Sequence, residues 1–138
     1  MNTKEMLKTL SHHFSDVECH TTFLEELSKI IKKELSGKEK QVFKQLTVQL
    51  ENIRSMGCLV HTADHNEKLK HLDGHYYSIH LESSQYNVRL LIYITDENTA
   101  YFLCAFYERS GKSRTNYSQY TPILKKRLKQ MLGDDEDE

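Results

Sequence analysis

The sequence predicts an α+β fold in which two helices pack on one face of a small antiparallel sheet, and a short helix ends the fold. The first observation behind this prediction is a change in hydrophobic period. Apolar residues recur at helical spacing up to residue 57, and at every second position from residue 72 onward. The second is the boundary chemistry, because capping residues precede the helical stretches and polar clusters separate the strands.

The first two predicted elements are a weak strand over residues 13–20 and a helix directly after it. Thr22 and Glu25 have the Thr-x-x-Glu spacing of a capping box, which predicts the helix start. The helix would bury one apolar stripe, made of Phe23, Leu27, Ile30, Ile31 and Leu35.

A second helix is predicted from the segment 36–39, where Ser36 and Glu39 repeat the capping signature. Gly57 is a plausible C-cap for it. Its stripe consists of Phe43, Leu46, Leu50 and Ile53. The short connection between the two helices makes them antiparallel neighbours.

Three antiparallel strands follow, separated by the polar turns 83–85 and 96–98. The third, Thr99–Tyr107, is apolar on both faces and is therefore expected to be central. Thr121 and Pro122 mark the N-cap and first position of a closing helix. The apolar stripe of that helix contains Leu124, Leu128 and Met131.

Length and composition favour one domain over residues 1–132, followed by an acidic disordered tail at 133–138. No apolar run approaches the roughly 20 residues of a membrane helix, and the first residues lack the features of a signal peptide. Three cysteines are too few for a disulfide framework. We therefore expect a cytoplasmic protein without a membrane partner.

The net charge of −1 conceals an uneven distribution. Residues 1–74 are balanced, residues 75–132 carry an excess of four positive charges, and five acidic residues end the chain. The C-terminal half is therefore basic, which suits an anionic partner. The acidic end is typical of a solubilising tail.

Basic and aromatic residues gather on the face of the sheet away from the two helices. His80 and Arg89 lie there on neighbouring predicted strands, and three more cations follow in the loop after the third strand: Arg109, Lys112 and Arg114. The aromatic residues among them are Tyr107, Tyr117 and Tyr120. Guanidinium groups bind phosphate bidentately, and tyrosine rings stack on single-stranded bases. The set favours an RNA-binding face, although an ordinary solvated face has a similar composition.

Four segments resemble toxins of the RelE superfamily, in the HigB and phage-derived HigB-like branch. Residues 69–81 (LKHLDGHYYSIHL) resemble the opening motif of that family, and residues 86–93 (YNVRLLIY) resemble its arginine-bearing strand. Residues 102–113 (FLCAFYERSGKS) are similar to its last strand and basic loop, and residues 125–129 (KKRLK) to its closing helix. The segments occur in order and together span about 60 residues.

The resemblance implies a RelE-like, microbial ribonuclease-like sheet. It also implies a type II toxin, which cleaves messenger RNA on the ribosome and is held in check by an antitoxin protein. The reaction is attack of a ribose 2′-hydroxyl on the adjacent phosphate, and it needs no metal and no other cofactor. It does need a proton acceptor, a proton donor and cations around the phosphate.

The resemblance also assigns catalytic roles. Arg89 would clamp the phosphate, Arg109 would stabilise the leaving group, and His80 would transfer protons, since its pKa suits that task. Tyr117 or Tyr120 would supply the C-terminal aromatic residue. The residues expected to bind RNA are Lys112, Arg114, Tyr107, Tyr120 and Lys126.

The sequence departs from the family pattern at Glu108, where a lysine is common, and at 78–80, where Ser-Ile-His replaces Glu-Leu-Arg. These departures keep an alternative open, namely a ParE-like gyrase inhibitor or an inactive relative that only binds a partner. Another alternative is a zinc site at Cys58, His61 and His65. Their spacing matches no standard zinc finger, so we expect no metal there.

Overall fold

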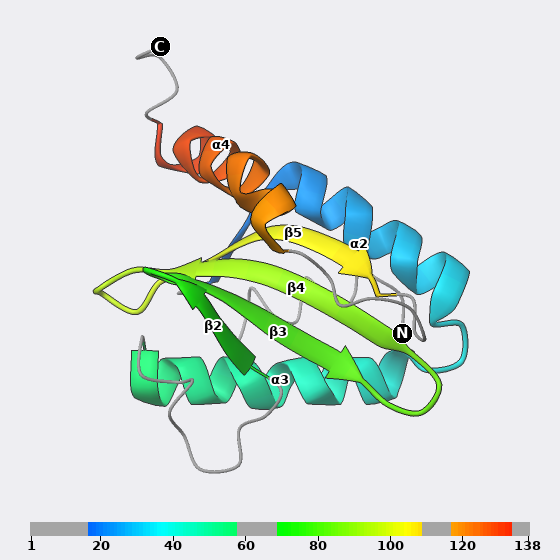
Figure 1. Ribbon diagram of the computed structural model, residues 1–138. Helices are drawn as coiled ribbons and strands as arrows, with labels where there is room; N and C mark the ends of the chain where they lie inside the picture. The colour runs from blue at the N-terminus through cyan, green and yellow to red at the C-terminus, as the bar shows by residue number, and fades with distance from the viewer. Residues whose placement is uncertain (1–16, 58–68, 109–116, 134–138) are drawn as a thin grey trace.

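The computed structural model describes residues 17–57, 69–108 and 117–133. It confirms the predicted α+β class and shows a five-stranded mixed sheet and three α-helices in these residues (Figure 1). The elements in chain order are β1 (Val17–Cys19), α2 (Thr21–Glu34), α3 (Glu39–Met56), β2 (Leu69–Asp73), β3 (Tyr76–Glu82), β4 (Asn87–Ile94), β5 (Ala100–Tyr107), the 3₁₀ turn η2 (Tyr117–Tyr120) and α4 (Thr121–Leu132).

The strands lie in the order β1-β5-β4-β3-β2. The antiparallel pairing of β3, β4 and β5 confirms the predicted three-stranded meander, and β5 lies inside the sheet as expected. The prediction of a wholly antiparallel sheet is wrong, because β1 pairs with β5 in parallel. A strand of three residues carries no pattern that reveals the direction of a distant partner.

Strand β2 was not predicted as a separate strand. It pairs antiparallel with β3, and its register shifts between His71 and Asp73. This irregularity interrupts the two-residue period, which is the signal that a sequence pattern can reveal. Strand β2 forms the edge of the sheet opposite β1.

The helix starts differ from the predicted capping boxes. The N-cap of α2 is His20, whose Nδ1 accepts a hydrogen bond from the Thr22 backbone N–H at 3.0 Å. An imidazole lone pair thus takes the role expected of a Thr22 hydroxyl. Helix α3 starts after Lys38 rather than Ser36, and α4 after Tyr120 rather than Thr121. The predicted C-cap at Gly57 is confirmed.

Helices α2 and α3 pack on one face of the sheet, as predicted. Their apolar stripes share one buried cluster with alternate residues of the strands, such as Ile79 of β3 and Leu90 of β4. Helix α4 packs on the other face, where Leu124 and Leu128 form a second buried cluster with Leu91 of β4. In Figure 1, α4 lies beside β5 at the top of the view and α3 runs along the bottom, below β2 and β3. We call the α4 side the open face.

An irregularity in β5 changes the side to which its last residues point. Leu91 pairs with Cys104 and Ile92 with Phe102, so Leu103 is an additional residue between them. Beyond this bulge, Ala105 and Tyr107 pack with the helix-side cluster, whereas Phe106 packs on the open face. A regular strand starting at Tyr101 would have placed them the other way round.

The outer edge of β5 is covered by β1 only as far as Phe102. Beyond it, the Ala105 N–H donates to Glu26 Oε1 at 2.9 Å, and Arg127 Nη1 donates to the Leu103 carbonyl at 2.7 Å. Glu26 and Arg127 also form a bidentate pair, with both N–O distances at 3.0 Å. This side-chain clamp joins α2, β5 and α4, and it satisfies backbone groups that an exposed edge would leave unpaired.

Burial protects the two cysteines that the structure describes, Cys19 and Cys104, from reaction with thiol reagents. It raises the pKa of the Cys19 thiol to about 12, and with the nearby Glu26 carboxylate it raises that of Cys104 to about 12. Since the thiolate is the reactive form, only ~1 in 10,000 of such thiols is reactive at pH 8.

We expect a Cys58→Ser variant to show no fast reaction with a thiol reagent when folded. Two thiols should react in guanidinium chloride, and rapid native labelling would contradict the packing.

No helix within the described ranges is both long and apolar enough to cross a membrane.

Candidate functional site

The open face places two of the predicted catalytic residues together. His80 of β3 lies directly opposite Arg89 of β4 in the strand register. The alternation of β3 puts Glu82 on the same face, and the bulge in β5 puts Glu108 there as well. The pairing of His80 with Arg89 across neighbouring strands agrees with the predicted arrangement.

Arg89 lies between two carboxylates that the sequence analysis did not assign to the site. Its Nη1 donates to Glu82 Oε1 at 3.1 Å, and its Nε lies 3.6 Å from Glu108 Oε1. The side chains of Arg89 and Glu108 are only 13% and 15% exposed, and that of Glu82 is 31% exposed. The guanidinium is therefore largely shielded and held by charge on two sides.

The sequence indicated the position of Glu82 on the open face, but it did not indicate that of Glu108. Glu82 stands two residues after His80, so the period of β3 already placed it on the same face. Glu108 was noted only as a departure from a lysine-rich pattern. Regular alternation in β5 directs it to the helix side, and the bulge at Leu103 brings it to Arg89 instead.

The three tyrosines that were predicted to share the open face do not share one position in the structure. Tyr107 packs against the helix-side cluster, so its predicted position on the open face is wrong, and the bulge in β5 is the reason. Tyr120 does face the sheet, and its ring stacks on Phe106 at a centroid distance of 4.7 Å and an angle of 11°. One face of the Tyr120 ring is thus already covered. Tyr117 lies in η2, and its side chain is outside the described part.

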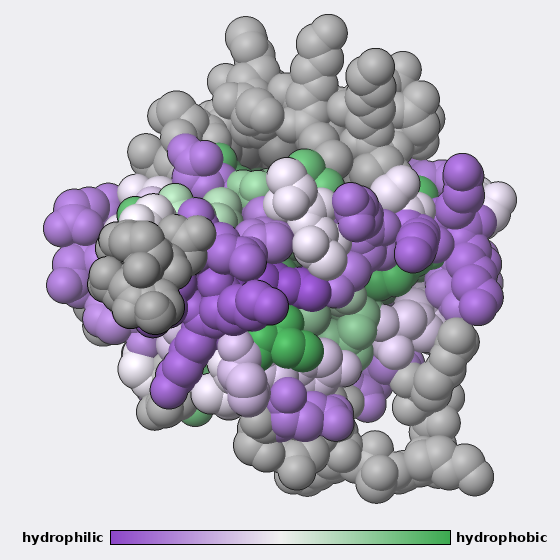
Figure 2. Space-filling view, turned by 90° about the horizontal axis from the view of Figure 1, so that it is seen from above, coloured by the Kyte–Doolittle hydropathy of each residue, from purple (hydrophilic) through white to green (hydrophobic). Residues whose placement is uncertain are grey.

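The remaining predicted site residues are basic. Lys126 is exposed on α4, which carries further exposed lysines at positions 125 and 129. Figure 2, seen from above, shows hydrophilic side chains over much of the described surface there, around a smaller apolar area. Arg109, Lys112 and Arg114 lie outside the described residues.

Two histidines of the described residues, His71 and His75, contact backbone carbonyls near turns. His71 Nε2 is 2.8 Å from the Gly74 carbonyl, and His75 Nδ1 is 2.6 Å from the Ile94 carbonyl. A carbonyl only accepts hydrogen bonds, so each of these nitrogens is a donor. Residues 17–57, 69–108 and 117–133 contain no cluster of three ligands that could hold a metal ion. Cys58, His61 and His65 lie outside these ranges.

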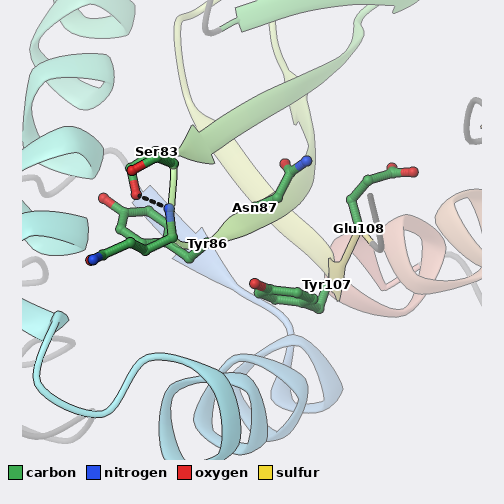
Figure 3. Close-up of a pocket in the computed structure, with 7 residues that line it drawn as sticks. Ser83, Tyr86, Asn87, Tyr107 and Glu108 are labelled. Carbon is green, nitrogen blue, oxygen red and sulfur yellow. Dashed lines mark hydrogen bonds between the residues drawn. The ribbon is translucent and has the colours of Figure 1, made fainter. Parts of the chain in front are cut away.

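A pocket of about 290 Å³ lies at the end of the sheet (Figure 3). One of its lining residues is Glu108, which also contacts Arg89. The pocket is formed where the β3–β4 turn meets the end of β5, and the Glu108 N–H donates to the Asn87 carbonyl at 2.8 Å. Tyr86 is fixed by a hydrogen bond from its hydroxyl to Gln45 Oε1 of α3 at 2.8 Å, and burial raises its pKa. The lining residues are Ser83, Ser84, Gln85, Tyr86, Asn87, Tyr107 and Glu108.

Together, the open face presents a carboxylate, a guanidinium and an imidazole on adjacent strands. A carboxylate can accept a proton, an imidazole can donate or accept one near neutral pH, and a guanidinium can stabilise negative charge on phosphate oxygens. The arrangement therefore contains each group needed for transfer of a phosphate ester by acid–base catalysis.

Comparison with known proteins gives no match. No family model matches the sequence, and neither a curated protein nor a solved structure is found to be similar to it.

Proposed function

We propose that the protein is a cytoplasmic toxin of the RelE/HigB type that cleaves messenger RNA and is neutralised by an antitoxin protein. The observation that carries the proposal is the juxtaposition of Glu82, Arg89 and His80 on the open face. The family resemblance of residues 69–129 supplies the substrate, which is mRNA on the ribosome.

The proposed reaction is attack of a ribose 2′-oxygen on the adjacent phosphorus, with departure of the 5′-oxygen. Glu82 accepts the 2′-hydroxyl proton, because it is the more exposed of the two carboxylates. Arg89 stabilises the charge on the phosphate oxygens, and His80 gives a proton to the leaving 5′-oxygen. The products are a 2′,3′-cyclic phosphate and a 5′-hydroxyl. Arg109, Lys112 and Arg114 would add phosphate contacts.

A second candidate is a relative that binds a partner, such as gyrase, without cutting RNA. One observation favours it: Arg89 already has two carboxylate neighbours, at 3.1 and 3.6 Å. A phosphate must compete with these carboxylates before Arg89 can bind it.

The proposal is tested by adding the purified protein to a cell-free translation reaction and mapping the mRNA ends. We expect translation to stop and cleaved mRNA to carry 5′-hydroxyl ends, with no effect of a metal chelator. His80→Ala should reduce the cleavage rate at least about 100-fold, because it removes the proton donor.

The matched control is His71→Ala, since His71 is exposed and contacts the Gly74 turn away from the cluster. This variant should cleave like the wild type. Toxicity without cleaved RNA would reject the nuclease and support the binding protein.

A further inference from the structure

The two carboxylates beside Arg89 contact it in different ways. Glu82 accepts a hydrogen bond from Nη1 at 3.1 Å, whereas the carboxylate oxygen of Glu108 lies 3.6 Å from Nε, which is too far for a hydrogen bond. Nε is buried and has no hydrogen-bond partner among the described residues. Glu108 therefore acts on Arg89 through its charge, and the guanidinium keeps unused donor capacity for an incoming oxygen.

The backbone fixes Glu108 beside Arg89. Its N–H donates to the Asn87 carbonyl at 2.8 Å, which ties the residue to β4 directly after the end of β5. The side chain of Glu108 is 15% exposed, against 31% for Glu82, so water and salt screen its charge less. The negative charge of Glu108 is thus a fixed and weakly screened feature of the site.

The charges around Arg89 determine which phosphates the site can accept. One guanidinium and two carboxylates give the cluster of Glu82, Arg89 and Glu108 a net charge of −1. A phosphodiester brings one negative charge, whereas a phosphate monoester brings about two at pH 8, because its second pKa is about 6. The additional charge of the monoester meets a net repulsion here, while a lone arginine would attract it.

We propose that Glu108 is a specificity residue, which makes the Arg89 site accept phosphodiesters and reject phosphate monoesters. The inference rests on the proposed function for its substrate, an internal phosphate of RNA. In the proposed reaction, Glu82 takes the 2′-hydroxyl proton and loses one negative charge as the phosphate gains one. The total charge of site and substrate therefore stays constant, so Glu108 does not oppose the reaction. A phosphorylated RNA end brings its second charge without this compensation.

The test compares two ligands that differ by one methyl group and one charge, thymidine 3′-phosphate and its methyl ester. Neither ligand has a 2′-hydroxyl, so neither can be cleaved. Binding to the full chain at pH 8 is followed by NMR through the Arg89 Nε–H signal. The methyl ester should bind about ten times more tightly, because the monoester places a further charge near Glu108. In Glu108→Gln, the monoester should bind at least as tightly as the ester.

A second measurement needs no variant. At pH 5 the monoester carries mostly one charge, so the wild-type protein should bind the two ligands within about twofold of each other. Any protonation of His80 at that pH affects both ligands alike, because they then carry the same charge. A tenfold preference that persists at pH 5 would show that the methyl group rather than the charge is selected, and it would overturn the inference.

The matched control is Glu97→Gln in the exposed β4–β5 turn, which should keep the preference of the wild type. A wild-type protein that binds the monoester as tightly as the ester at pH 8 overturns the inference, and so does a folded Glu108→Gln protein that keeps the preference. If RNA cleavage then persists and depends on His80, the proposed function stands without this role of Glu108. A preference for the ester in a protein that never cleaves RNA supports the role of Glu108 and rejects the nuclease.

Discussion

Replacing Arg89 with alanine is expected to reduce RNA cleavage at least about 100-fold, because the phosphate loses its charged hydrogen-bond donor in the transition state. The site around Arg89 is only partly open to water, which strengthens the effect of a single guanidinium. The loss should appear mainly in the turnover rate, which single-turnover cleavage of a short RNA measures. Arg89→Lys should restore only part of the rate, since lysine cannot form the bidentate contact.

Two controls separate a catalytic effect from a structural one. Arg54→Ala removes the same side chain from the exposed end of α3, on the other side of the sheet, and should leave cleavage unchanged. The thermal midpoint of Arg89→Ala shows whether Glu82 and Glu108 repel each other enough to unfold the chain. A folded Arg89→Ala protein that cleaves like the wild type would remove Arg89 from the mechanism.

Replacing Glu26 with alanine is expected to lower the free energy of unfolding by about 2–3 kcal/mol. The substitution leaves the Ala105 N–H without its acceptor and the Arg127 guanidinium, 15% exposed, without its carboxylate. The expected loss of stability is at the lower end for a broken ion pair, because Glu26 is 28% exposed and water can partly replace its carboxylate. For a domain of this size, the thermal midpoint should fall by roughly 10 °C.

The matched control is Glu25→Ala, an exposed neighbour on α2, which should change stability by less than about 0.5 kcal/mol. The double variant Glu26→Leu/Arg127→Met should be more stable than the sum of the single losses, since it leaves no unpaired charge. Equal denaturation midpoints for Glu25→Ala and Glu26→Ala would show that the clamp contributes nothing.

Much of this fold could be predicted because its helices and strands have different hydrophobic periods, and each has one apolar face and one more polar face. The stripes of α2 and α3 and the alternation of β3 and β4 identify the helix-covered face directly. The short polar turn between β3 and β4 also made His80 and Arg89 neighbours.

The rest depends on features that a local pattern does not show. The bulge at Leu103 reverses the side of every later residue in β5, so Tyr107 was placed on the wrong face and Glu108 was missed. The cap at His20 could not be predicted because histidine is not among the usual N-cap residues. The direction of β1 depends on a partner 83 residues away in the sequence, Val17 with Ala100.

That parallel pairing of β1 with β5 has a consequence for synthesis of the chain. Strand β1 and the apolar stripe of α2 are synthesised before β5, the strand that completes their contacts. Contacts between such distant segments form late, after the intervening chain exists. Arg89 likewise obtains Glu108 only when β5 is finished. The open-face cluster of Glu82, Arg89 and Glu108 is therefore assembled only after β5 has been synthesised.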